Sequence, residues 1–328
     1  MKIIEVITHR EHINTVESIG KKYGAVDQWH VGPLNDKHRA VIRLLVDGNH
    51  RQAVMDALLN TIGKHESTRI MVVPVDVTLP IIEPEPNENT KTKSGGATRE
   101  ELYHTISKGA ELNSNFLLLV FLSTIVAAIG LLENNLAVVV GAMVIAPLLG
   151  PNIALALAAA LGDTPLMWTS LKTNLAGLGL ALAISLTIGL LLPIDMKSQE
   201  LLSRTVVGID SVVLALASGA AAVLSMTTGL SSVLVGVMVA VALLPPTATV
   251  GLMLGSGQFT LAGGAALLLA VNIVCVNLAA KTVFLTRGIK PRTWLEKRKA
   301  KQSMTTYIVF WVVSLLVLLV AIYLRSQL

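Results

Sequence analysis

Residues 138–163 read VVVGAMVIAPLLGPNIALALAAALGD, and residues 233–258 read VLVGVMVAVALLPPTATVGLMLGSGQ. Aligned without gaps at an offset of 95 residues, the two segments agree at ten of 26 positions, including Pro151 with Pro246. Apolar segments match one another by chance, but chance does not readily place glycines and prolines in one register. The chain therefore contains an internal repeat, and each copy carries helix breakers inside an apolar run.

The region around this repeat is too apolar for a soluble protein. Of the 328 residues, 53% are hydrophobic and 14% are charged, whereas soluble domains carry about 25% charged residues. The low charge also excludes an intrinsically disordered chain. A membrane-spanning helix needs about 20 apolar residues. Seven runs are predicted to span a membrane: Phe116–Leu132, Leu136–Leu161, Asn174–Leu192, Ser211–Thr228, Ser232–Leu254, Leu261–Leu285 and Tyr307–Leu324.

Charged residues are sparse in this region. Between Phe116 and Ala280 only eight residues are charged, and the acids Glu133, Asp163 and Asp210 fall at predicted span ends, where water reaches them. This pattern argues against a proton relay built on buried carboxylates. The same pattern is compatible with a channel, or with a carrier that contacts its solute through carbonyl and amide groups.

The repeat offset groups the first six spans into two units of three. The first unit covers residues of about 115–192 and the second about 210–285, with the span at 307–324 as an addition. Because three is an odd number, the second unit enters the membrane from the opposite side. Inverted repeats with broken helices are common in secondary transporters. The predicted fold is therefore a multi-pass α-helical membrane domain of about seven spans, with a 3+3 inverted repeat and broken helices.

Both copies of the repeat place prolines near the middle of a span. Proline lacks a backbone N–H, so the carbonyls that it frees need other partners in the membrane. Two broken helices facing each other would direct half-helix ends into a midplane site. The alternative is that the prolines only bend packed helices and that amide side chains join helices together. The candidate site residues are Pro147, Gly150, Pro151, Asn152, Pro245, Pro246, Thr247, Thr249, Asn272 and Asn277.

Lysine and arginine gather in the connection after the sixth span. Residues 286–303 read TRGIKPRTWLEKRKAKQS and hold seven of them. The positive-inside rule makes this connection cytoplasmic, which places the N-terminus inside and the C-terminus outside. This topology also explains the net charge of +5, so the basic balance does not predict nucleic-acid binding.

Residues 1–79 form a separate head, in which short β-branched runs alternate with helical patterns. The element order is βαββαβ, the ferredoxin-like α+β arrangement. Thr8 and Asn49 are predicted helix caps, and Pro74 indicates an edge position for the last strand. The predicted strands are Lys2–Thr8, Ala25–Val31, Arg39–Asp47 and Thr68–Val77.

Two groups in the head have ligand-binding chemistry. Lys37, His38 and Arg39 lie on a predicted hairpin, where an anion or a nucleotide phosphate could bind; a solvated turn is the alternative. His9 and His12 are spaced as metal ligands at a helix start. No carboxylate or cysteine completes a metal pattern around them, so no metal is predicted.

The segment between head and membrane domain divides in two. Residues 80–97 are rich in Pro, Glu, Asn, Thr and Gly and are predicted to be a flexible linker. From Thr98 a helical pattern begins again, with Leu102 and Ile106 on one side, and it predicts an amphipathic helix leading into the first span. The transmembrane domain is therefore assigned to residues 98–328.

Five spaced motifs connect the chain to a known family. With them the chain resembles the DUF389 family of uncharacterised prokaryotic hydrophobic membrane proteins, over roughly residues 97–300. The resemblance implies a prokaryotic cytoplasmic (inner) membrane. The motifs are GAMVIAPLLGP at 141–151, Gly162-Asp163, VALLPPTAT at 241–249, VNIVCVNLAA at 271–280 and RGIKPRTW at 287–294.

The sequence favours a membrane transporter or channel for a small solute or ion, regulated by a small molecule bound to the cytoplasmic head. The alternative is a membrane-anchored receptor or scaffold that senses a ligand without transport.

The spans hold no His/Glu/Asp cluster, phosphate-binding loop or nucleophile elbow, so neither an enzyme nor a cofactor is predicted. Cys275 is the single cysteine, which excludes an intrachain disulfide. Glycine- and alanine-rich spans permit close helix approach and predict a homo-oligomer in the bilayer.

Overall fold

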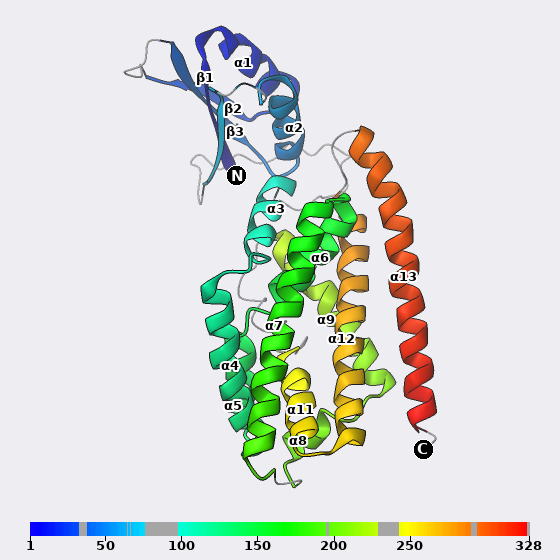
Figure 1. Ribbon diagram of the computed structural model, residues 1–328. Coiled ribbons are helices and arrows are strands. Elements are labelled where there is room, and N and C mark those ends of the chain that lie inside the picture. Colours follow the sequence, from blue (N-terminus) through cyan, green and yellow to red (C-terminus); the bar gives the residue numbers. More distant parts are fainter. Residues whose placement is uncertain are drawn as a thin grey trace. The chain divides into compact units, whose positions relative to one another are not determined.

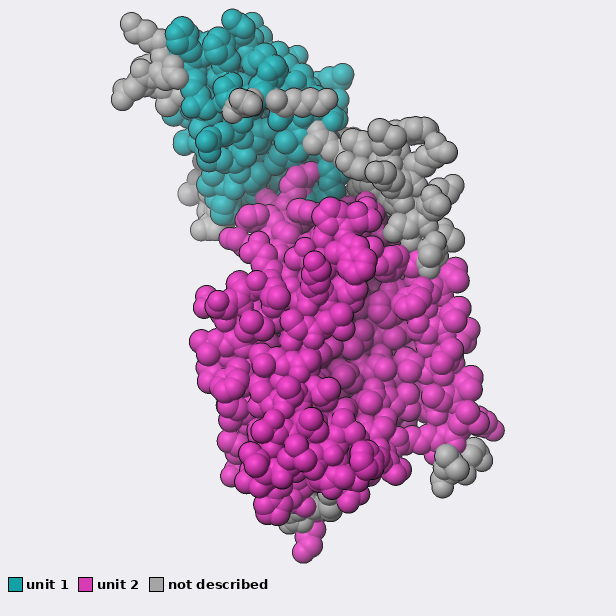
Figure 2. Space-filling view, in the orientation of Figure 1, with its two compact units in different colours: residues 1–99 teal, residues 100–328 magenta. Residues whose placement is uncertain are grey.

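The computed structural model describes residues 1–32, 38–63, 65, 67–75, 98–194, 197–228, 243–289 and 294–326, with the backbone alone for 294–306, 308 and 326. The chain divides into two compact units, Met1–Arg99 and Glu100–Leu328 (Figures 1 and 2). The predicted linker at 80–97 lies outside the described residues.

The first unit is a four-stranded sheet with two helices, in the predicted βαββαβ order (Figure 1). All strand pairs are antiparallel and the strand order is β2-β3-β1-β4. This order puts β4 at an edge, as Pro74 indicated. The elements are β1 (Lys2–His9), η1 (Arg10–His12), α1 (Ile13–Lys22), β2 (Asp27–Val31), β3 (Arg39–Val46), α2 (Arg51–Thr61) and β4 (Arg69–Pro74).

One apolar core joins the sheet to both helices. Ile4 and Val6 of β1 alternate inward along the strand and pack with Val16 of α1 and Leu58 of α2, all at 0% exposure. Both helices therefore cover the same face of the sheet. Gly24, at φ +79°, ends the first helical segment because a left-handed residue cannot continue a helix.

Both predicted caps in the head are wrong. Thr8 is buried in β1, where its hydroxyl lies 3.1 Å from that of Thr68, so it is unavailable to cap a helix. The start of α2 is capped by Asp47, whose carboxylate accepts hydrogen bonds from the backbone N–H of Asn49 and of His50. A carboxylate in this position also complements the helix dipole.

The second unit is entirely helical in its described part. It contains α3 (Arg99–Lys108, which begins at the unit boundary), α4 (Ser114–Leu132), α5 (Leu136–Ile145), α6 (Leu149–Leu161), α7 (Thr164–Leu191), α8 (Gln199–Ser203), α9 (Ile209–Thr228), α11 (Leu244–Gly255), α12 (Phe259–Thr286) and α13 (Trp294–Ser326). α3 is the helix predicted from Thr98, with Leu102 and Ile106 buried.

By length and composition, four of the described helices, α4, α7, α9 and α12, are apolar enough to cross a membrane, or five if the bent pair α5 and α6 counts as one span. This is therefore a membrane protein. Of the predicted span Ser232–Leu254, residues 232–242 lie outside the described residues and the rest belongs to α11. The predicted span Tyr307–Leu324 lies within α13, in which Val309–Arg325 is an apolar helical segment.

Two predicted connections are in fact helical. The third span was expected to begin at Asn174, but α7 begins at Thr164, where the Asp163 side chain caps it and Pro165 occupies its first turn. Proline is favoured there because the N–H that it lacks has no helical partner. Likewise α13 begins at Trp294, inside the connection predicted for 286–306.

The helix boundaries recur at the offset of 95 residues found in the sequence. α4, α6 and α7 begin at residues 114, 149 and 164, and α9, α11 and α12 begin at 209, 244 and 259. α7 and α12 are each 28 residues long. Before these two helices, Gly162 and Gly257 adopt φ +71° and +76°, so the same left-handed turn separates the helices in both halves.

Glycines bring the helices of the second unit into close contact with one another. A Cβ atom at Gly177 would lie 2.8 Å from the side chain of Leu148, and one at Gly219 would lie 2.8 Å from the Cα atom of Val276. The glycine-rich segments from which a homo-oligomer was predicted are thus used, at these positions, for packing within one chain.

Candidate functional site

The first break lies between α5 and α6. α5 ends at Ile145, Ala146 is extended (φ −69°, ψ 119°), and the two helices are bent by 48°. A residue before proline avoids the helical region, which explains why the helix stops immediately before Pro147. Because Pro147 and Pro151 carry no N–H, the carbonyls of Met143 and Pro147 lose their intrahelical donors. The predicted mid-span break is confirmed at this position.

α11 begins at Leu244, and residues 229–242 before it lie outside the described residues, so the predicted second break stays a prediction. Pro245 and Pro246 both lie in the first turn of this helix, where proline is tolerated. Thr247 satisfies its hydroxyl within the same turn, by donating to the Leu243 carbonyl at 2.7 Å. Thr249 is 0% exposed, and among the described residues its hydroxyl has no hydrogen-bond partner.

The first break and the start of α11 share one buried cluster. Ala146 and Leu148, on either side of Pro147, belong to the same apolar cluster as Leu243 and Leu244, which precede Pro245. Two segments that are about 95 residues apart in the sequence are therefore packed together.

A pair of amides lies beside this cluster. Asn277 of α12 donates from Nδ2 to Oδ1 of Asn152 in the first turn of α6, and also to the Ile273 carbonyl at 2.9 Å. Both side chains are 1% exposed. Within the described structure, Asn152 Nδ2 and Asn277 Oδ1 have no partner. An unsatisfied buried polar group costs about 1–3 kcal/mol, so two of them side by side indicate a polar site rather than a packed core.

Two other predicted site residues have different neighbours. Gly150 lies against the backbone of Gly109, and a Cβ atom at position 150 would be 2.8 Å from the Gly109 carbonyl oxygen. Its small size therefore serves helix packing. Asn272 is 8% exposed and precedes Asn277 on α12 by five residues, so it lies away from the face that holds the amide pair.

Sequence reasoning missed a buried cation. Lys281 of α12 is 1% exposed and is among the largest fully buried side chains in the protein. Its Nζ atom lies 5.1 Å from the ring centroid of Tyr307 of α13, and the Tyr307 hydroxyl donates to the sulfur of Met167 in the first turn of α7. Lys281 follows Asn277 by one helical turn, so both side chains lie on one face of α12.

A signal for this lysine was present in the sequence. It is the first charged residue after the charge-free run of 211–280, and it lies five residues before the end of α12. Charged residues within membrane helices are rare and commonly functional. Lys281 lies inside the predicted sixth span, Leu261–Leu285, and is its only charged residue.

At the end of the membrane domain where α7 begins, Tyr103 of α3 donates to Asp163 Oδ2 at 2.7 Å, while Asp163 Oδ1 accepts from the Leu166 N–H at 3.0 Å. The hydrogen bond to the carboxylate raises the pKa of Tyr103 to about 12, and burial and the charge of Asp163 act in the same direction. This contact fixes the amphipathic helix α3 to the capped start of α7.

Of the candidate ligand residues of the head, only His38 and Arg39 are described, so the predicted anion site stays a prediction. Lys37 lies outside the described residues. The ring of His38 stacks on that of His9 at 6.0 Å, and the Arg39 guanidinium donates to the Ser67 carbonyl at 2.7 Å. Among the described residues, no group of three His, Cys, Asp or Glu side chains could hold a metal ion.

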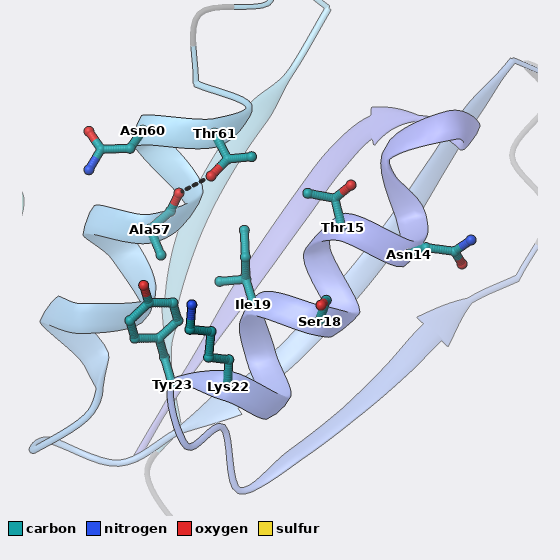
Figure 3. Close-up of a pocket in the computed structure, with 9 residues that line it drawn as sticks. All are labelled: Asn14, Thr15, Ser18, Ile19, Lys22, Tyr23, Ala57, Asn60 and Thr61. Atoms are coloured by element: carbon teal, nitrogen blue, oxygen red, sulfur yellow. Dashed lines mark hydrogen bonds between the residues drawn. The ribbon is translucent and has the colours of Figure 1, made fainter.

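The head has a groove elsewhere, between α1 and α2. Its volume is about 500 Å³. Figure 3 shows Ile19 between the two helices, with Lys22 and Tyr23 side by side at one end. The Lys22 Nζ atom lies 5.6 Å from the centre of the Tyr23 ring. The groove is lined by Asn14, Thr15, Ser18, Ile19, Lys22, Tyr23, Ala57, Asn60 and Thr61.

The fold and the broken helices define a polytopic membrane protein with a small α+β domain at its N-terminus. The chain belongs to the family described as "Domain of unknown function (DUF389)", whose model matches residues 143–278. This range begins in α5 and ends one residue after Asn277, so it contains the α5–α6 break and all of α11. The resemblance inferred from the sequence motifs is confirmed.

Relatives of the chain include an uncharacterized protein of Methanocaldococcus jannaschii. The two are 35% identical over 283 residues, which is 86% of this chain and 87% of the relative. The similarity therefore extends over both units. No solved structure matches the chain.

Proposed function

We propose that the protein transports a small solute or ion across the membrane through the region where the α5–α6 break packs against the start of α11. The observation that carries this proposal is the unsatisfied amide pair, Asn152 and Asn277, buried beside the α5–α6 break in an otherwise apolar unit. Irregular backbone and unpaired polar groups at membrane depth are tolerated where they line a cavity or a solute site.

The proposed architecture is a 3+3 inverted repeat with an additional last span. The common helix starts at an offset of 95 residues support it, because α4, α6 and α7 correspond one by one to α9, α11 and α12. α13 supports the added span, since Tyr307 lies beside Lys281 near one end of α12 and Arg325 donates to the Thr260 carbonyl at the other. In this arrangement the head and the end of α12 are cytoplasmic, and the C-terminus is outside.

Flux measurements on reconstituted protein test the proposal. Full-length protein in liposomes should take up at least one solute from a panel of anions, cations and neutral molecules, whereas empty liposomes should not. Replacing Asn152 with leucine should reduce this uptake strongly, because it removes one side of the amide pair. Folded wild-type protein that moves no member of such a panel would contradict transport.

We further propose that the groove between α1 and α2 binds a small molecule that regulates transport. A volume of about 500 Å³ is within the range of small-molecule sites. Lys22→Ala should abolish the effect of such a ligand on flux, and leave the basal flux unchanged. The same groove favours the second candidate function, a receptor or scaffold without transport. Deleting residues 1–95 separates the two, because a transporter keeps its flux and a receptor loses its response.

Self-association in the bilayer is a further part of the proposal. It is supported by the small residues of the spans, although Gly177 and Gly219 pack within the chain. Mass measurement of the protein in native membranes or nanodiscs decides it: a single-chain mass at all concentrations would exclude a homo-oligomer.

A further inference from the structure

We infer that the transported solute is a small anion and that Lys281 provides the charge that attracts it. This inference rests on the proposed transport function and adds the sign of the solute. Three observations carry it: the buried lysine, the amide pair one turn below it, and the start of a half-helix at that pair.

A buried ammonium group is the first observation. Lys281 is 1% exposed on α12, five residues before its end, or about 8 Å along the helix. Transferring a charged side chain from water into a membrane domain is costly, so such residues commonly mark ion or substrate pathways. The ring of Tyr307 lies over the ammonium group and shields it from one side.

The amide pair continues the same path deeper into the domain. Asn277 lies one turn below Lys281, nine residues or about 14 Å from the end of α12. Asn152 Nδ2 is an N–H donor without a partner among the described residues. A donor at this position can replace water around an anion as it leaves the ammonium group.

The third observation is the direction of α6. This helix begins at Leu149 and carries Asn152 in its first turn. The N-terminus of a helix bears a partial positive charge, and half-helix N-termini in transporters face anionic groups. The helix dipole, the free amide donor and the ammonium group therefore all favour a negatively charged solute.

The described carboxylates of the same region lie elsewhere. Glu133 and Asp163 flank helix ends, and Glu200 is in the short helix α8. Asp210 lies in the first turn of α9, and the other three lie outside the long apolar helices. The acceptors that the described structure offers a cation at the amide pair, Asn277 Oδ1 and the carbonyls freed at the α5–α6 break, are uncharged.

Uptake by proteoliposomes tests the sign of the solute. The probes are potassium salts of chloride, nitrate, phosphate, acetate and succinate, with rubidium as the cation and glycerol as the neutral solute. We expect wild-type protein to take up at least one of the anions, and neither rubidium nor glycerol. The inorganic and organic salts then distinguish a small inorganic ion from a carboxylate.

Two variants connect the uptake to Lys281. Lys281→Gln should lower the initial rate of anion uptake by about tenfold or more, because a hydrogen bond to a charged group is worth about 1.5–3 kcal/mol. Lys172→Gln is the matched control, since it removes a positive charge from an exposed position on α7 and should leave uptake unchanged. Asn152→Asp keeps the side-chain size and adds a negative charge, so it should also suppress anion uptake.

The outcomes separate this inference from the proposed function. Uptake of rubidium or glycerol without any anion would overturn the inference and leave transport standing. Anion uptake that Lys281→Gln and Asn152→Asp do not change would overturn the role of Lys281. If wild-type protein, monodisperse and folded, moves none of the probes, the transport proposal itself fails.

Discussion

The two halves of the membrane domain, residues 114–191 and 209–286, have equivalent helix starts. They differ at two equivalent helix–helix interfaces, which we call seams: one between α6 and α12, the other between α7 and α11. In one seam α6 packs against α12, and it holds Asn152 and Asn277 with Lys281 one turn away. In the equivalent seam α11 packs against α7, and the positions 95 residues away are Thr247, Leu182 and Leu186. One backbone plan thus carries a seam with two paired amides, the polar seam, and a seam without them.

The seam between α7 and α11, the glycine seam, is also the tighter one. A Cβ atom at Gly251 would lie 2.7 Å from the Leu186 N atom, and one at Gly255 would lie 2.6 Å from the Leu186 carbonyl oxygen. A Cβ atom at Gly189 would likewise lie 2.5 Å from the Leu252 carbonyl oxygen. The difference teaches that a shared helical plan does not impose a shared chemistry: the polar seam pairs two buried amides, and the glycine seam brings two helix backbones into close contact.

The largest effect is expected from filling the glycine seam. Gly251→Val places a branched side chain against the backbone of α7, which cannot move away, so we expect a loss of about 3 kcal/mol or more, at or above the upper end of overpacking effects. Gly179→Val is the matched control, because nothing lies within 4 Å of a Cβ atom at that position. Thermal melting and size-exclusion profiles in detergent measure both. Equal stability of the two variants would show that the seam is loose.

The next effect compares the two left-handed turns. Gly162→Ala and Gly257→Ala each force a side chain into φ near +70°, which costs about 1–2 kcal/mol. Because the turns have the same geometry, both substitutions should lower the melting temperature by similar amounts. A large loss in one half with no loss in the other would contradict the common backbone plan.

A smaller effect distinguishes the polar seam from its counterpart. Asn152→Leu leaves the Asn277 amide without its acceptor and should cost about 1–2 kcal/mol. Adding Asn277→Leu should restore much of this stability, because removing both partners leaves no orphaned polar group. Thr247→Val, the equivalent change in the other half, should cost less, since that hydroxyl bonds within its own turn.

Flux measurements on the same variants decide whether the amide pair serves transport or only helix packing. The double variant Asn152→Leu with Asn277→Leu should regain stability and still fail to transport. A double variant that is both stable and fully active would reduce the amide pair to an element of helix packing, which was the alternative reading of the sequence.

The smallest effect concerns the capped starts of α7 and α12. The pKa of Tyr103 is raised to about 12 by Asp163, whereas Gln258, at the equivalent position before α12, makes no capping bond with its side chain. The folded state holds the phenol proton more tightly than the unfolded state does. The stabilisation is therefore complete below pH 10 and is lost as the pH rises from about 10 towards 12.

Asp163→Asn checks this contact. The asparagine still caps α7 through its side-chain oxygen but removes the charge. Ultraviolet titration of phenolate absorbance should show one tyrosine moving from about 12 towards its usual pKa, and the alkaline loss of stability should begin at the same pH in both proteins but become shallower. An unchanged titration curve would exclude Asp163 as the cause.

Much of the membrane domain was predictable because apolar length and helix breakers act locally. The starts of α5, α9 and α12 fall within two residues of those predicted, and the α5–α6 break falls at Pro147. The start of α7 was missed by ten residues because Lys172 and the polar residues before it suggested a connection. An N-cap at Asp163 followed by Pro165 outweighs that pattern.

The candidate site was predictable only in part. The sequence alone determined the class of protein, the internal repeat, the position of the breaks and the polar side chains that follow them, because each depends on neighbouring residues. Only the tertiary structure decided that Asn152 meets Asn277, that Tyr307 covers Lys281, and that one seam is polar while the other is closed by glycines. Those contacts join residues far apart in the chain, and they depend on how close two backbones approach, which composition and periodicity do not encode.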